Sequence, residues 1–450
     1  MQHRIPWSKP RRAGALAAAL LAVWAAPALR AAEERKPAGT CASADATIVR
    51  REAPDKPWQV VKHGEQLFTN DLLVGMPGAA IDSADGAVRL DLLSDPDRRS
   101  PYPILEAAVV LHVSPGHDLD FTLDRGRVNL TNKKKAGAAK VRVGFHDQSW
   151  GVALEAPGAE VALQLYGRWP AGARFTTQPG PQDVPQANLL LLVVKGEARV
   201  KHGGATHFMK APPGPAQLHW CNKVGGESPE LLEALPPWAD ARRRDTPRAK
   251  LLKAAMDKFR KLAVEKSLPA AIDEFLESDQ PAERAMAIIF LGATDNLEGL
   301  RKVFHEPKQH ELWDTAIIVM RHWLGRGAGQ DMKLYHGLTT IGRYTPAHAA
   351  TIMQLLHSYG EDDLARPELY EMLVRYMGHD ALGIRGLAHW HLYRLVPEGQ
   401  KFNFNPLAPK EEREKARAEW KKLIDKEIAA GRLPRKHKPA AAKAPEKSAK

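Results

Sequence analysis

Hydrophobic and polar residues alternate with strand spacing in two passages of the first half of the chain, residues 58–92 and 189–220. In each passage, short apolar runs are separated by Gly, Pro, Asn or Asp, which interrupt strands and form tight turns. The pair Asp85-Gly86 between two such runs is typical of a hairpin, because glycine readily adopts a positive φ. Both passages therefore predict antiparallel β structure.

The region between these passages has the same alternation. It predicts five more strands, at residues 107–113, 118–123, 127–130, 140–145 and 161–166. Their regular spacing favours a β-sandwich or a rolled antiparallel sheet. Residues 189–194 are apolar throughout, which predicts a strand buried on both faces, and Gly203-Gly204 predicts a further hairpin.

The pattern of the second half of the chain predicts helices. Residues 223–246 contain glycine pairs, prolines and a charge cluster that interrupt both periodicities, so we expect a linker there. Beyond it, proline in the first turn and glycine after the last turn mark helix ends. The helices predicted in this way begin at Pro247, Pro281, Pro346, Pro367 and Pro409, within a helical region of residues 247–431.

Several of the predicted helices share an Ala-rich apolar phrase. It occurs at residues 285–291 and 315–320, with a looser copy at 384–390. Such degenerate recurrence is typical of stacked helix pairs. This half resembles HEAT or armadillo-like repeats, which implies an α-helical superhelix, and a compact all-α domain is the alternative. The predicted fold class is multidomain, β then α.

The turn motifs of the β half carry a second resemblance. Residues 62–65 (Lys-His-Gly-Glu), 85–90 (Asp-Gly-Ala-Val-Arg-Leu) and 124–128 (Asp-Arg-Gly-Arg-Val) resemble FecR-type domains. Residues 195–200 and 211–220 resemble the closing strands of long versions of that module. The resemblance covers a domain of about residues 58–222, and it implies a β-rich envelope module with a sensory or regulatory role.

The N-terminus has the form of a secretory signal peptide. A basic start that ends in Arg11-Arg12 precedes the apolar run 13–26, and Ala26-Pro27-Ala28 supplies small residues for cleavage. The run is shorter than the roughly 20 residues that span a bilayer. We expect residues 1–28 to direct export to the periplasm or cell envelope, with an uncleaved anchor as the alternative. Residues 29–57 are expected to be a flexible leader.

The formal net charge of +12 is concentrated at the two ends of the chain. Residues 1–35 and 432–450 together hold most of the excess, so the body is nearly balanced and nucleic acid is not an expected partner. Residues 432–450 are rich in Lys, Ala and Pro, which predicts a disordered tail. Its cations, among them Arg435, Lys436 and Lys438, either contact a polyanion or membrane head groups or simply solubilise the chain.

The chain has two cysteines, Cys41 and Cys221. In an oxidising compartment they can form one disulfide that ties the leader to the end of the β domain. The alternative is two free thiols.

The sequence contains one group of candidate ligand-binding residues. The spacing of His, Cys, Asp and Glu predicts no catalytic, metal or cofactor site. Trp150, Tyr166 and Trp169 are candidate ligand-binding residues, because sugars stack on flat rings, and core packing is the other interpretation. We therefore expect an exported, non-enzymatic envelope protein that binds protein partners, with carbohydrate binding by the β domain as the alternative.

Overall fold

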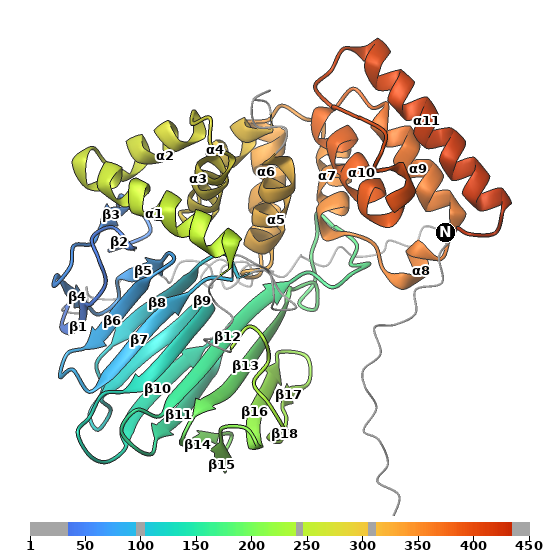
Figure 1. Ribbon diagram of the computed structural model, residues 1–450. Coiled ribbons are helices and arrows are strands. Elements are labelled where there is room, and N and C mark those ends of the chain that lie inside the picture. The colour runs from blue at the N-terminus through green and yellow to red at the C-terminus, as the bar shows by residue number, and fades with distance from the viewer. Residues whose placement is uncertain (1–34, 96–103, 240–245, 305–311, 434–450) are drawn as a thin grey trace, which may run out of the picture. The chain divides into compact units, whose positions relative to one another are not determined.

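The computed structural model describes residues 35–95, 104–239, 246–304 and 312–433. Within these ranges a mostly β region precedes a helical region, as the sequence predicts (Figure 1). The predicted signal peptide lies outside the described residues. Among the helices of this part of the chain, none is long and apolar enough to cross a membrane.

The β region contains eighteen strands within the described residues. They are β1 (Pro37–Cys41), β2 (Ile48–Arg51), β3 (Gln59–Val60), β4 (Gln66–Phe68), β5 (Leu72–Gly75), β6 (Ala79–Ser83), β7 (Val88–Leu93), β8 (Ala107–His112), β9 (Leu119–Asn132), β10 (Ala139–Phe145), β11 (Gln148–Leu154), β12 (Glu160–Arg168), β13 (Gln186–Lys195), β14 (Glu197–His202), β15 (Ala205–Lys210), β16 (Gly214–Cys221), β17 (Gly225–Gly226) and β18 (Glu230–Leu232).

These strands form one mixed sheet made of two ladders that share β9. The N-terminal half of β9 pairs with β8 and, in parallel, with β10, and this ladder continues through β11 and β14 to β15. The C-terminal half pairs with β7 and β12, and this second ladder continues through β13 to β16. Apolar side chains of both ladders make one core, as the burial of alternate residues in β7 illustrates.

A glycine allows β9 to change ladders. The motif Asp124-Arg125-Gly126-Arg127, which the sequence suggests is a turn that opens a strand, lies inside β9. Gly126 has a φ of +88°, and the register of β8 against β9 shifts between Ala108 and Val109. This bulge bends the strand, so its two halves can serve different neighbours.

Eleven α-helices follow within the described residues. They are α1 (Pro247–Glu265), α2 (Leu268–Leu276), α3 (Pro281–Ala293), α4 (Leu297–Val303), α5 (Trp313–Leu324), α6 (Gln330–Thr340), α7 (Pro346–His357), α8 (Glu361–Leu364), α9 (Pro367–Met377), α10 (Leu382–Leu395) and α11 (Lys410–Ala429). The five helix starts that proline predicts are confirmed to within one residue, because proline's fixed φ suits the first helical turn.

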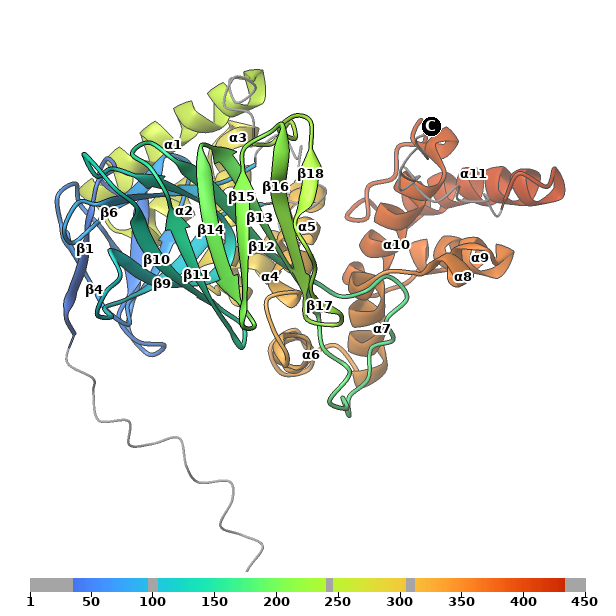
Figure 2. The same cartoon turned by 90° about the horizontal axis from the view of Figure 1, so that it is seen from below.

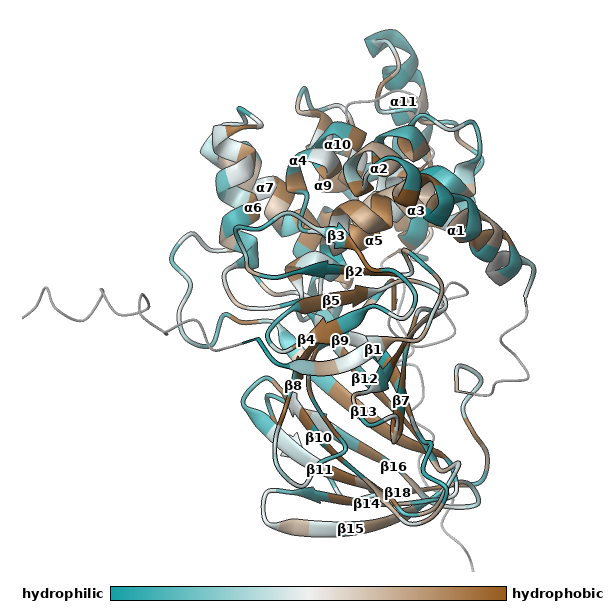
Figure 3. Cartoon of the chain, turned by 90° about the vertical axis from the view of Figure 1, so that its left-hand side faces the viewer, coloured by the Kyte–Doolittle hydropathy of each residue, from teal (hydrophilic) through white to brown (hydrophobic). Residues whose placement is uncertain are grey.

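The helical core continues into the sheet. Buried residues of β2, β5 and β8 belong to the same apolar cluster as the helices, and α3, α5 and β5 are largely brown in Figure 3. A second contact comes from the long connection between β12 and β13, which reaches α7 (Figure 2). There the amide of Phe175 donates to Gln354 Oε1 at 3.0 Å, and Gln354 Nε2 donates to the carbonyl of Ala173 at 3.1 Å.

The prediction of a flexible leader at residues 29–57 is wrong for the two strands that this segment contains. β1 pairs with β4 and β6, and β2 pairs with β3 and β5, so Pro37–Cys41 and Ile48–Arg51 belong to the sheet. Ala38, Cys41, Ile48 and Val49 are buried there. The leader therefore contributes apolar side chains to the core, although its own sequence has little strand pattern.

The expected linker at 223–246 is also partly structured. Both β17 and β18 pair with β16. Trp238 and Ala239 are buried in a small apolar cluster with strand residues, and the Arg127 guanidinium lies 4.4 Å from the Trp238 ring centroid. This cation–π contact holds the connector against the sheet.

The two cysteines do not pair. Cys41 in β1 and Cys221 in β16 are buried free thiols on strands that are not neighbours in the sheet. The Cys41 thiol lies 3.6 Å from the Ser43 carbonyl, whereas Cys221 Sγ accepts hydrogen bonds from Gln186 and the Lys223 amide. The disulfide expected as one alternative is therefore absent.

The start of the predicted tail is ordered. Arg432 pairs with Glu427 at 2.6 Å, and Leu433 is buried. Arg435, Lys436 and Lys438 lie outside the described residues.

The bend in β9 generates a first prediction. An alanine Cβ at Gly126 would lie 2.1 Å from the Glu106 carbonyl oxygen, whereas one at Gly137, whose φ is +79°, would meet nothing within 4 Å. Both substitutions place alanine in the left-handed region, at about 1–2 kcal/mol. We expect Gly126→Ala to lower the free energy of unfolding by at least about 3 kcal/mol and Gly137→Ala by about 1 kcal/mol in urea denaturation. Equal losses would contradict the proposed clash.

Candidate functional site

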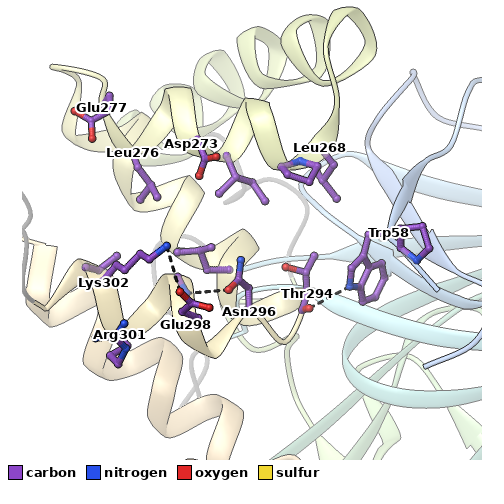
Figure 4. A pocket seen from close by; sticks show the side chains of 16 residues that line it. Trp58, Leu268, Asp273, Leu276, Glu277, Thr294, Asn296, Glu298, Arg301 and Lys302 are labelled. Carbon is purple, nitrogen blue, oxygen red and sulfur yellow. Dashed lines mark hydrogen bonds and ion pairs between the residues drawn. The ribbon is translucent and has the colours of Figure 1, made fainter. Parts of the chain in front are cut away.

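A groove of about 900 Å³ lies between α2, α4 and the segment that precedes β3 (Figure 4). We call it the α2–α4 groove. Its lining residues are Pro57, Trp58, Leu268, Pro269, Ile272, Asp273, Leu276, Glu277, Leu291, Thr294, Asn296, Glu298, Gly299, Arg301, Lys302 and Val303. This volume is in the range of sites that hold a ligand or several side chains of a partner.

The groove has an apolar floor and two walls of different charge. Buried Leu268, Ile272 and Leu291 form the floor. On α2 the wall carries the exposed carboxylates Asp273 and Glu277, and on α4 it carries Arg301 and Lys302. Lys302 pairs with Glu298 one turn earlier at 3.4 Å, and Asp273 points into the groove in Figure 4. The arrangement suits an apolar segment with charged edges.

The local sequence explains where α2 begins and which of its sides is buried. Ser267 is the N-cap, and its hydroxyl accepts a hydrogen bond from the Ala270 amide at 3.4 Å, with Pro269 in the first turn. Both features favour a helix start at this point. Ala271 and Phe275 are buried on the side that packs against neighbouring helices, while Asp273 is exposed.

The turn between α3 and α4 is fixed by the β region. The Trp58 indole donates to the Thr294 carbonyl at 3.0 Å, and the Arg51 guanidinium lies 4.7 Å from the Trp58 ring centroid. Arg51 also pairs with Asp295 at 3.3 Å. Asn296 Oδ1 then accepts the Gly299 amide at 2.8 Å and caps α4. Trp58 is therefore both part of the groove and a brace for its α4 side.

A buried ionic group lies next to this turn. We call it the Glu106 cluster, and it consists of Glu106, Arg125, Asp295, His322 and Arg326. Glu106 is 1% exposed, and its Oε1 lies 2.8 Å from Arg125 Nε, 2.6 Å from Arg326 Nη2 and 3.3 Å from His322 Nε2. Asp295 Oδ1 accepts from Arg326 at 3.1 Å. Arg125 of β9 and His322 of α5 thus share the buried carboxylate of Glu106, while Asp295, whose side chain is 37% exposed, lies at the edge of the cluster.

The charges decide the protonation state of the cluster. Burial alone raises the pKa of Glu106, but the His322 ring and the guanidinium groups of Arg326 and Arg125 outweigh it and hold the pKa well below its ordinary value. Burial and the charge of Arg125 lower the pKa of Arg326 to about 10, so Arg326 remains protonated at neutral pH. Glu106 is therefore an anion that accepts from cations.

The same arginines satisfy the end of α3. Arg125 Nη2 donates to the Ala293 carbonyl at 2.9 Å, and Arg326 Nη1 donates to the Gly292 carbonyl at 3.0 Å. The last carbonyls of a helix have no partners inside the helix and carry partial negative charge. These cations therefore hold the end of α3, from which the groove turn begins.

The three aromatic candidates do not form a shared platform. Trp150, Tyr166 and Trp169 are 1%, 7% and 9% exposed, and each ring packs on a different histidine. Burial and the charge of Arg321 lower the pKa of His357 to about 4, so its neutral ring stacks on Trp169 at 4.3 Å. The prediction that these residues form an exposed sugar-stacking surface is therefore wrong, because their apolar faces are used in packing.

The groove residues were not predicted from the sequence. The sequence pattern predicts Trp58 only as the start of a strand, and it predicts no helix at α2, although Ser267 and Pro269 favour a helix start. The Glu106 cluster joins residues about 200 positions apart, and no local pattern connects them. Within the described residues, no group of three or more His, Cys, Asp or Glu side chains could hold a metal ion.

Comparison of the chain with known protein families, with curated proteins and with solved structures found no match.

The brace at Trp58 generates a second prediction. Trp58→Phe removes the hydrogen bond to Thr294 and should lower the free energy of unfolding by about 1 kcal/mol. Amides of α4 should exchange faster with solvent in hydrogen-exchange measurements, because the turn before α4 loosens. Trp390→Phe is the matched control, since it removes an indole hydrogen bond to Asp314 away from the groove. Unchanged exchange in α4 of the Trp58 variant would contradict the brace.

The Glu106 cluster generates a third prediction. Glu106→Gln removes the charge that two buried arginines need, and at pH 7 we expect a loss of roughly 3–5 kcal/mol in the free energy of unfolding. Because the pKa of Glu106 is lowered in the folded state, its contribution is complete above the unfolded value of about 4.3. It is lost as the pH falls through the folded value.

The measurement is urea denaturation of the wild type and of Glu106→Gln between pH 7 and pH 3. The difference between the two proteins should shrink toward the acid end. Glu361→Gln, at the exposed start of α8, is the control and should differ little from the wild type at any pH. A difference that stays constant with pH would show that the charge of Glu106 is not what stabilises the junction.

Proposed function

We propose that this protein is an exported, non-enzymatic component of the cell envelope with a sensory, regulatory or scaffold role, and that it acts by binding a partner protein. The observation that carries the proposal is the α2–α4 groove. Its occupant is an amphipathic segment of an envelope protein, with its apolar face on the floor of Leu268, Ile272 and Leu291.

Charge complementarity supports this choice of occupant. The α2 wall presents Asp273 and Glu277, and the α4 wall presents Arg301 and Lys302, of which Lys302 pairs with Glu298. A bound segment with a basic edge toward α2 and an acidic edge toward α4 satisfies both walls in one orientation. Opposite charges at the rim of an interface contribute mainly to specificity and association rate, while the apolar centre supplies most of the affinity.

The proposed architecture agrees with such a role. In this proposal the two strand ladders are the layers of a FecR-like β-sandwich, and the helices form a HEAT-like superhelix. Contacts between successive helices, such as α2 with α3 and α9 with α10, support the repeat interpretation. Residues 1–28 would direct export, and Arg435, Lys436 and Lys438 would tether the tail to an anionic envelope surface.

The test uses the full-length protein with a photoreactive side chain at position 276, in the groove. Irradiation of intact cells should give a discrete protein adduct there. The same side chain at position 251, an exposed leucine of α1 that does not line the groove, should not give that adduct. Glycan adducts alone, or the same adduct from both positions, would contradict the proposal.

Affinity then decides whether the captured protein is the true occupant. The purified partner should bind wild type, and Leu276→Asp should weaken binding about 30-fold, because a carboxylate in place of a half-buried leucine of the groove costs about 2 kcal/mol. Leu251→Asp, which changes a leucine that is 63% exposed, is the matched control and should leave binding unchanged. Equal affinity of all three proteins would exclude the groove as the binding site.

A further inference from the structure

A second concave site lies on the sheet, away from the helices. A hollow of about 500 Å³ is open over β11 and the hairpin of β14 and β15, and we call it the β11 hollow. The strands that form it are at the lower edge of the sheet in Figure 1. None of the interactions that fix the α2–α4 groove involves this hollow, so the two sites can be tested separately.

Strand register explains how the hollow forms. Arg142 of β10 is opposite Gly151 of β11, Gly151 is opposite Lys201 of β14, and Lys201 is opposite Thr206 of β15. These four residues therefore form one row across the sheet on the face away from the buried core. A Cβ at Gly151 would meet only the Lys201 side chain, at 3.8 Å. The missing side chain of Gly151 thus leaves a gap between two cations.

The cation on one side of the gap is oriented by a buried carboxylate. Asp120 is 3% exposed, and it binds Arg142 through Nε at 2.9 Å and Nη2 at 2.6 Å. This two-point contact fixes the guanidinium plane and leaves the Nη1 donors for a ligand. Lys201 on the other side is exposed and is free to move toward a bound anion.

The rest of the lining favours negative charge. Among the described residues that line the hollow, none carries a carboxylate. Ser149 and Thr206 supply hydroxyl groups. Two cations and hydroxyl donors around a gap are groups that bind oxyanions.

We infer that the β11 hollow binds an oxyanion, the phosphate or carboxylate group of a small ligand or of a head group. The anion lies over Gly151 between Arg142 and Lys201, with Thr206 as a further donor.

The test is calorimetric titration of the full chain with inorganic phosphate at low ionic strength. Lys201→Ala and Arg142→Gln should each weaken binding about tenfold, which corresponds to about 1.4 kcal/mol. Gly151→Val keeps every charge but fills the gap, and it should abolish binding. Lys415→Ala, an exposed lysine of α11, is the control and should bind like wild type.

Vesicles separate the two sources of the anion. Phosphatidylcholine vesicles with and without phosphatidylglycerol are compared in a sedimentation assay with the same variants. Binding of free phosphate that depends on Lys201 and Gly151 supports a soluble ligand. Binding only to phosphatidylglycerol vesicles with the same dependence supports a head group. No binding in either assay, or binding that Gly151→Val and Lys201→Ala leave unchanged, would overturn the inference.

Discussion

The buried carboxylate of Glu106 is the interaction on which the arrangement of strands and helices depends. It lies just before β8, and its partners come from the bulge of β9 and from the end of α5. Transfer of such a charge from water carries a penalty of several kcal/mol, and only well-placed partners offset it. Arg125 and Arg326 meet that requirement at 2.8 and 2.6 Å. The sheet and the helices must therefore adopt one relative position at this point.

The need to pair the buried charge of Glu106 connects the bulge of β9 to the groove. Arg125 can reach Glu106 because Gly126 bends β9 with a positive φ, and its other nitrogen then reaches the end of α3. Once α3 ends against fixed cations, the turn to α4 is held by Trp58 from the β region. The floor of the groove is helical, but its shape is set by the sheet. Binding sites often occur where two regions of a chain meet.

Local chemistry made part of the fold predictable. The starts of α1, α3, α7 and α9 follow from proline, which favours the first helical turn. No such residue begins α5 or α10, and only their Ala-rich apolar sequence predicts these helices. Similarly, β7 alternates clearly, whereas Pro37–Cys41 resembles a loop and becomes a strand only by pairing with β4 and β6.

Local sequence patterns do not predict the site either, because it also depends on contacts between distant segments. In the sequence, Gly126 is typical of a turn. Its positive φ belongs to a bulge, which only the strand pairing on both sides of it reveals. The rings of Trp150 and Trp169 are large enough for a ligand platform, but histidines from distant segments cover them. Ser267 and Pro269 signal the start of α2, but the groove and the Glu106 cluster as assembled sites have no sequence signal, because both depend on residues that meet only after the chain has folded.

A charged junction has a consequence that an apolar one lacks. Apolar surfaces are attracted in many relative orientations, and volume-conserving changes are usually tolerated. By contrast, Glu106 must meet three donors at hydrogen-bond distance, and an arginine displaced from it would remain buried and unpaired. Directional bonding at the junction therefore restricts the angle at which the C-terminal end of α3 meets the sheet. Since α3 leads directly into α4, that angle also sets the separation of the two groove walls.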